Sequence, residues 1–114
     1  MDKYSSSLDT VFHALADPTR RSVVQRLGTG QATVSELAKP FDMALPSFMK
    51  HLRVLEASGL IRSQKRGRVR TCQINAKKLL TAQTWIAKQR ALWEGRADRL
   101  TDYVERMSYE EESL

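Results

Sequence analysis

Basic side chains are concentrated in one short part of the sequence, between residues 50 and 70. This stretch contains seven lysines and arginines and one acidic residue, Glu56, which equals the net charge of +6 of the whole chain. A concentrated positive surface favours a polyanion, because each neutralised phosphate releases a condensed counterion. A run of charge can also be only a solvated surface, so the charge alone leaves both interpretations open.

Residues suited to other kinds of chemistry are few. The 114-residue chain has a single cysteine, which excludes an internal disulfide and a multi-cysteine metal cluster. We expect this residue, Cys72, to be an inert half-buried thiol, because no second cysteine or basic helix terminus would activate it. No His–carboxylate, Cys–His or glycine-rich phosphate motif is evident, so the sequence predicts no enzyme activity and no cofactor.

Nothing in the sequence indicates a membrane or secreted protein. No apolar run reaches the roughly 18 residues that a membrane-spanning helix needs, and the N-terminus MDKYSSSLDT lacks the pattern of a secretion signal. The sequence therefore predicts a cytoplasmic protein without membrane contact. Its length predicts a single domain over residues 1–114.

Local signals predict the elements that would position the basic stretch. A helix over about residues 8–16 is followed by Asp17 as an N-cap and by Pro18 at the first position of the next helix. Thr33 and Glu36 have the spacing of a capping box at the start of a short third helix.

A further helix is predicted from Leu45 or Pro46 to about residue 58, with Gly59 as the C′ residue of a Schellman ending. Its buried face, at helical spacing, consists of Phe48, Leu52 and Leu55. Two helices joined by a short turn, over about residues 33–58, make a helix-turn-helix.

The second half of the basic stretch is typical of a β-hairpin. Over about residues 60–75, the segments from Leu60 to Gln64 and from Val69 to Asn75 alternate as two strands would, and Gly67 can supply a positive φ at the tip. A helix-turn-helix followed directly by a hairpin is a winged helix, mainly α with a β-hairpin wing. In this fold one helix enters the major groove of DNA and the wing reaches the flanking backbone or minor groove. Fold and charge agree, which favours nucleic-acid binding over a merely solvated surface.

Candidate DNA contacts lie on the exposed face of this helix and on the wing. They are Ser47, Lys50, His51, Arg53, Lys65, Arg66, Arg68 and Arg70. Two have alternatives within the protein: His51 could pack beside the wing or bond a backbone carbonyl, and Arg53 could pair with Glu56. Arg20 and Arg21 are cations at the start of a helix, where the helix dipole is unfavourable to them. We therefore expect one of them to pair with an acidic residue such as Asp17.

The last helix, over about residues 76–108, is too long for the core of so small a domain. Apolar residues recur along it every seven positions, in a stripe that needs a partner helix. The helix could fold back on its own domain, but its length favours pairing with a second copy of the chain. The interface residues predicted on it are Leu79, Ile86, Trp93, Leu100 and Val104.

Three segments resemble the ArsR-type winged-helix transcriptional regulators: ALADPTRRSVVQRL, ATVSELAKPFDMALPSFMKHLRVLEASGLI and WIAKQRALWEGRADRLTDYV. The resemblance covers roughly residues 8–106. It implies a homodimer, paired through its first and last helices, which adds Val11, Phe12 and Leu15 of the first helix to the predicted dimer interface. It also implies binding to a palindromic, inverted-repeat operator in double-stranded DNA, usually as a repressor that an inducer releases.

The sequence departs from the family at its metal sites and at its DNA-reading face. The segment VSELAKPF lacks the family's cysteine pair, and no histidine follows His51 to build a site on the last helix, so we predict no metal. Family members often have serine where Ala44 stands and a small hydroxyl residue where Met49 stands. Both changes imply fewer polar contacts with DNA.

The sequence thus predicts a sequence-specific DNA-binding regulator, a homodimeric repressor. The alternative is a winged helix that serves as a protein-interaction module without specific DNA binding. For the inducing signal three possibilities stay open: a small organic molecule between the long helices, a thiol oxidant, or no signal beyond protein level.

Overall fold

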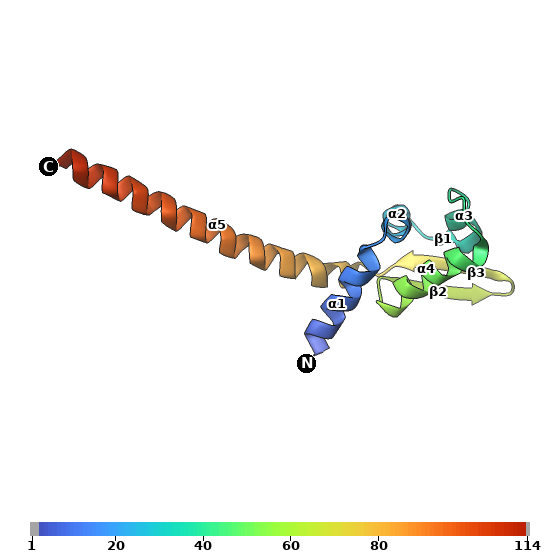
Figure 1. The fold of residues 1–114 in the computed structure, drawn as a ribbon. Helices are drawn as coiled ribbons and strands as arrows, with labels where there is room; N and C mark the ends of the chain where they lie inside the picture. Colours follow the sequence, from blue (N-terminus) through green and yellow to red (C-terminus); the bar gives the residue numbers. More distant parts are fainter. Residues whose placement is uncertain (1–2, 114) are drawn as a thin grey trace. The chain divides into compact units, whose positions relative to one another are not determined.

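A computed structural model describes residues 3–113 and contains five helices and three strands among them (Figure 1). The helices are α1 (Lys3–Leu15), α2 (Pro18–Leu27), α3 (Val34–Ala38), α4 (Leu45–Ala57) and α5 (Ala76–Ser113). The strands are β1 (Ala32–Thr33), β2 (Ile61–Arg66) and β3 (Val69–Ile74). The contacts divide the chain into two compact units, one up to residue 82 and one from residue 83 onward.

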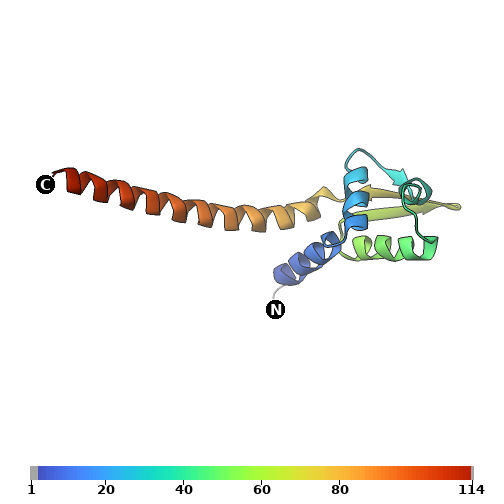
Figure 2. The same ribbon diagram turned by 45° about the horizontal axis from the view of Figure 1, so that its top comes forward.

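The first unit has the predicted winged-helix architecture. Its antiparallel sheet has the strand order β1-β3-β2, and α4 lies alongside the β2–β3 hairpin (Figure 2). Strand β1 has only two residues and pairs with β3 through Ala32 opposite Cys72 and Thr33 opposite Thr71. The sequence gives no signal for so short a strand, because it forms only through a partner some forty residues away.

The hydrophobic core joins the helices of this unit to the hairpin. The predicted buried face of α4 is confirmed, since Phe48, Leu52 and Leu55 are all buried. The other large, fully buried side chains are those of Val11, Val23, Leu27, Leu37, Leu60, Ile61 and Cys72. The expected assignment of Val11 to a dimer interface is wrong, because this side chain has no exposed surface and faces the core of its own unit.

The predicted helix caps are confirmed. The side chain of Asp17 accepts a hydrogen bond of 3.0 Å from the backbone N–H of Arg20, with Pro18 at the first helical position. Thr33 and Glu36 form both bonds of the capping box. These caps satisfy N–H groups that have no partner within their own helices.

Helix α4 ends in a Schellman motif. The N–H of Gly59 donates to the carbonyl of Glu56, and the N–H of Leu60 donates to that of Leu55. Gly59 has a φ of +81°, which side-chain-bearing residues rarely adopt. A Cβ atom there would lie 2.8 Å from Cε of Lys78. The hairpin therefore leaves α4 at a defined angle.

The wing closes through a two-residue turn. Gly67 is its first residue and has the predicted positive φ, +62°. Lys65 pairs with Arg70 and Arg66 pairs with Val69 next to this turn. Strand β2 extends to Arg66, two residues beyond its predicted end at Gln64, so the basic side chains beside the turn belong to regular strands.

The second unit is the greater part of α5, which continues to Ser113, five residues beyond its predicted end. The predicted stripe lies on its surface: Ile86, Trp93, Leu100, Val104 and Met107 are between 46% and 69% exposed. A hollow of about 350 Å³ lies along the stripe and is lined by Trp93, Arg96, Ala97 and Leu100.

Among the residues that the structure describes, no helix is long and apolar enough to cross a membrane.

Candidate nucleic-acid interface

The N-terminal half of α4 presents exposed polar side chains beside the wing. Ser47 and Lys50 are exposed on it, whereas Phe48 points into the core. Ala44 is the N-cap residue of this helix and makes no side-chain capping bond. The backbone N–H groups of the first turn therefore lack the side-chain partner that serine would provide, as the departure from the family pattern implied.

A groove separates the start of α4 from the wing. It has a volume of about 420 Å³ and is bordered by the starts of α3 and α4 on one side and by the wing on the other. The groove is lined by Thr33, Val34, Ser35, Leu45, Met49, Lys65, Arg68, Val69 and Arg70. Three of the eight candidate DNA contacts thus converge on one side of the wing.

The alternation of side chains along a strand divides the wing arginines between two faces. Lys65 and Arg70 are cross-strand partners and line the groove beside α4, together with Arg68 of the turn. Arg66 lies on the other face, where it lines a smaller hollow with Gln31, Gln64 and Thr71. The structure therefore does not bring Arg66 together with the other basic residues of the wing.

Arg70, a candidate DNA contact by its position on the wing, is bound within the protein. Its guanidinium donates a bond of 2.7 Å to the hydroxyl of Ser63, and this hydroxyl donates to the carboxylate of Glu56 on α4. This chain of bonds fixes the wing to α4. It also uses the carboxylate that was a possible partner of Arg53; among the described residues no ion pair joins Arg53 to Glu56.

His51 is half-buried, so the prediction that it lies on the exposed face of the helix is wrong. Its side chain is 24% exposed, and its Nδ1 lies 3.2 Å from Nη1 of Arg20 and 3.6 Å from Oδ2 of Asp17. Its partners thus belong to the start of α2, and they are neither the wing nor a backbone carbonyl. The reason is the close packing of α2 on α4, which the spacing of apolar residues within one helix does not reveal.

The two arginines at the start of α2 bind the end of α1. Arg20 donates from Nε to the carbonyl of Ala14 at 2.8 Å and from Nη2 to that of His13 at 3.1 Å. Arg21 donates from Nη1 to the carbonyl of Leu15 at 2.8 Å. The C-terminal carbonyls of a helix carry partial negative charge, so they bind cations favourably. The expected side-chain pairing with Asp17 is therefore replaced by this arrangement.

Two groups near the interface have shifted pKa values. The pKa of Asp17 lies below its ordinary value of 3.8, chiefly because the backbone N–H of Arg20 donates to its carboxylate. Burial raises the pKa of the Cys72 thiol above its ordinary value of 9.0, and the charge of Glu56 adds to the effect. A buried thiol with a raised pKa is poorly reactive, in agreement with the expectation of an inert Cys72.

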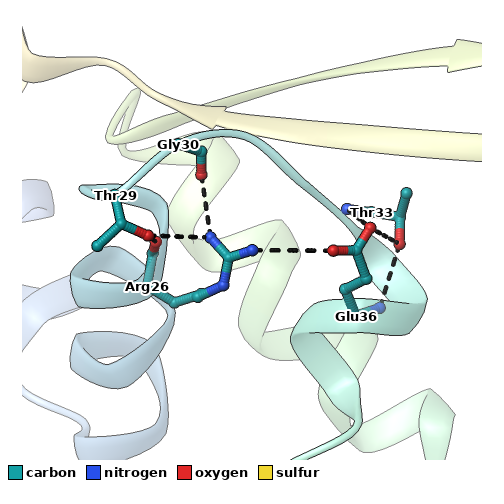
Figure 3. Close-up of polar contacts among 5 residues, drawn as sticks. All are labelled: Arg26, Thr29, Gly30, Thr33 and Glu36. Atoms are coloured by element: carbon teal, nitrogen blue, oxygen red, sulfur yellow. Dashed lines mark hydrogen bonds and ion pairs between the residues drawn. The ribbon is translucent and has the colours of Figure 1, made fainter.

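A polar cluster that the sequence analysis missed holds the segment between α2 and α3 (Figure 3). Arg26 donates 3.2 Å bonds to the hydroxyl of Thr29 and to the carbonyl of Gly30, and its Nη2 lies 3.8 Å from the carboxylate of Glu36. Glu36 is also the partner of Thr33 in the capping box. This cluster therefore holds the start of α3 in place.

No group of three metal-ligating side chains occurs in the part of the chain that the structure describes.

The fold and this polar surface define a winged helix-turn-helix protein, and comparisons with known proteins agree. A family model described as a helix-turn-helix domain matches residues 15–64. The HTH-type transcriptional regulator Rv2034 of Mycobacterium tuberculosis is 36% identical over 84 residues, which are 74% of this chain and 78% of that protein. The transcriptional repressor SdpR of Bacillus subtilis is 29% identical over 79 residues, which are 69% of this chain and 88% of that protein.

Solved structures give the same result. The crystal structure of an ArsR family transcriptional regulator, RHA00566, has 60% sequence identity and a TM-score of 0.78, and the match covers 82% of this chain and 97% of that one. A homodimeric winged helix-turn-helix DNA-binding domain from Mycobacterium bovis has the same fold at 24% identity and a TM-score of 0.59, covering 81% and 90% of the two chains. The present chain belongs to the ArsR family of transcriptional regulators and, as expected from its sequence, is not an enzyme.

Proposed function

We propose that the protein is a homodimeric repressor that binds an inverted-repeat operator in double-stranded DNA. The observation that carries this proposal is that Lys65 and Arg68 line one groove beside the start of α4, where Ser47 and Lys50 are exposed. In a winged helix this part of α4 enters the major groove, and the wing contacts the neighbouring backbone. A cytoplasmic location follows from this function, because the protein must reach the chromosome.

The residues of the proposed DNA surface have different tasks. Lys50, Arg53, Lys65, Arg66 and Arg68 are exposed and provide positive charge for phosphates or base edges. Ser47 lies near the N-terminus of α4, where a hydroxyl and the backbone N–H groups can bind one phosphate. His51 and Arg70 have partners within the protein and hold the recognition helix and the wing in place.

The dimer is proposed to form through the exposed stripe of α5, with half-buried Phe12 and Leu15 of α1 contributing. The charges on α5 favour antiparallel pairing of two copies. Residues 76–99 contain six basic and two acidic residues, whereas residues 100–113 contain one basic and five acidic residues. Antiparallel helices place the basic half of one copy beside the acidic half of the other, which is attractive at short range.

The wing assignment is tested by the salt dependence of DNA binding. The logarithm of the DNA-binding constant falls linearly with the logarithm of the salt concentration, and each lost phosphate contact is expected to reduce the magnitude of this slope by about 0.9. The Arg66→Ala/Arg68→Ala variant should therefore bind DNA more weakly and with a shallower slope than the wild type. Lys77→Ala/Lys88→Ala removes the same charge from exposed positions of α5, outside the proposed DNA surface, and serves as the control at concentrations at which sedimentation shows both double variants to be dimers.

Equal losses in both double variants would mean that only total charge matters and would contradict the wing assignment. Absent or salt-insensitive DNA binding in the wild type would favour the protein-interaction module. Release by a small-molecule inducer, usual in the family that the sequence resembles, belongs to the same proposal. It is tested by adding candidate compounds to the protein–DNA complex and measuring dissociation.

A further inference from the structure

One guanidinium group joins three helices of the first unit. Arg20 lies in α2, donates to the carbonyls of His13 and Ala14 at the end of α1, and approaches Nδ1 of His51 in α4. Arginine has five N–H donors in a planar fork, so it can make all three bonds at once. Arg21 beside it binds the carbonyl of Leu15 in α1 and, among the described residues, makes no hydrogen bond or ion pair with α4.

The contact with Arg20 determines the tautomer of His51. A guanidinium can only donate hydrogen bonds, so Nδ1 of His51, 3.2 Å away, must be the acceptor. A neutral imidazole carries one proton, which then resides on Nε2. The carboxylate of Asp17 lies 3.6 Å from Nδ1, beyond hydrogen-bonding distance, and accepts instead from the backbone N–H of Arg20.

His51 occupies a position from which it can set the DNA-reading surface. It follows Lys50 directly and lies four residues after Ser47, on the same side of α4. Its ring is half-buried against α2, whereas Ser47 and Lys50 are exposed. Any change in how this ring is held would therefore move the exposed side chains of Ser47 and Lys50.

We propose that Arg20 is a positioning residue for DNA recognition, which acts by holding Nδ1 of His51 and thereby fixing α4 relative to the end of α1. This role rests on the proposed function, because it acts on the DNA surface assigned above. In this proposal His51 acts by accepting a hydrogen bond from Arg20 at Nδ1, and not by a direct contact of Nε2–H with DNA. Substitution of His51 can separate these two roles.

Asparagine and glutamine each reproduce one half of the His51 ring. In His51→Asn the Oδ1 atom can accept from Arg20 in place of Nδ1, but the donor at Nε2 is lost. In His51→Gln the amide can replace the donor at Nε2, but the acceptor at the δ position is lost. We expect His51→Asn to bind a DNA probe within about threefold of wild type and His51→Gln to bind about tenfold more weakly, as for loss of a charged hydrogen bond.

Arg20→Ala should weaken DNA binding to a similar degree as His51→Gln, and Arg21→Ala should weaken it much less. Both variants lose a charge and at least one bond to α1, so Arg21→Ala is the matched control. Thermal unfolding would show whether each variant is folded. If Arg20→Ala does not fold, the two His51 variants still decide the question.

The tautomer is measured directly by the ¹⁵N chemical shifts of His51 in the wild-type protein at neutral pH. A neutral ring protonated at Nε2, which becomes a mixture of tautomers in Arg20→Ala, would support the proposal. A proton on Nδ1, or DNA binding retained by His51→Gln and lost by His51→Asn, would overturn it. Wild-type protein without affinity for any DNA would overturn the proposed function and this role with it, while leaving the tautomer unchanged.

Discussion

At the scale of single residues, two charged side chains at the start of α2 stabilise the ends of two helices, the N-terminus of α2 and the C-terminus of α1. Asp17 binds the N–H of Arg20 and so caps α2, while the side chain of Arg20 binds the last carbonyls of α1. Each charge thus lies beside the partial charge of opposite sign at a helix end. The junction between α1 and α2 is held by short polar contacts as well as by the core.

Removing the Asp17 cap is expected to destabilise the protein in a pH-dependent way. The pKa of Asp17 is lower in the folded state than its ordinary value of 3.8, so its ionised form stabilises the fold above that pH, and this contribution is lost as the pH falls through the folded pKa. Asp17→Ala should therefore cost about 1 kcal/mol at pH 7 and much less near pH 2.

The measurement is chemical denaturation of both proteins at several pH values. Asp9→Ala is the control, because Asp9 is an exposed residue within α1 and does not cap a helix. A difference between wild type and Asp17→Ala that stays constant down to pH 2 would contradict the role of the ionised carboxylate.

At the scale of elements, α4 has a well-formed end and an incomplete beginning. Its C-terminus has both bonds of the Schellman motif and a glycine of positive φ. Its N-cap residue, Ala44, has the extended backbone of a capping position, with φ −64° and ψ 144°, but no oxygen on its side chain. The helix that we propose to read DNA is therefore held mainly by its buried face, by the bond from Ser63 to Glu56 and by His51.

Ala44→Ser should stabilise the protein by roughly 0.5–1 kcal/mol, because a serine hydroxyl can accept from an N–H of the first turn. Thermal or urea unfolding would measure the gain. Ala57→Ser, at the other end of the same helix, is the control and should be neutral or slightly destabilising. Equal gains from both substitutions would show that capping geometry is not the cause.

Elements that depend on nearby residues were predictable from the sequence. The caps at Asp17 and Thr33, the glycine ending of α4 and the buried face of α4 each follow from spacings of a few residues. Strand β1 was not predictable, because its two residues form a strand only by pairing with β3. The end of α5 was predicted too early, since a solvated helix surface gives no sharp stop signal.

The polar contacts of the candidate site were predicted less well than the fold. The spacing of residues within α4 placed Ser47 and Lys50 on its surface, as observed. It could not show that His51 faces Arg20 or that Arg70 is bound to Ser63, because both contacts join separate elements. Val11 was assigned to a dimer surface through the family resemblance, and helical spacing alone could not correct this, because it does not distinguish a face buried in the same chain from one buried by a partner.

At the scale of the whole molecule, the proposal requires a second copy of the chain. Trp93 and Leu100 are 69% and 64% exposed, and such large apolar side chains repeated along one stripe are typical of an interface. Helix-turn-helix dimers place two recognition helices about 34 Å apart along the duplex, so dimerisation and operator symmetry depend on one another.

Leu100→Glu is expected to weaken the dimer strongly, because it places a charge in the centre of the stripe. Sedimentation should then show monomers at concentrations at which the wild type is dimeric. Thr101→Glu adds the same charge at the next, exposed position outside the stripe, and should leave the dimer nearly intact. Identical behaviour of the two variants would contradict the assignment of the stripe to the dimer interface.

The most direct test of the central claim is selection of bound sequences from a pool of random duplex DNA by the purified protein. The proposed function predicts enrichment of an inverted repeat whose half-sites lie about one helical turn apart. Recovery of no common sequence, together with binding that vanishes at moderate salt, would leave only a non-specific attraction between the basic wing and DNA and would contradict the claim.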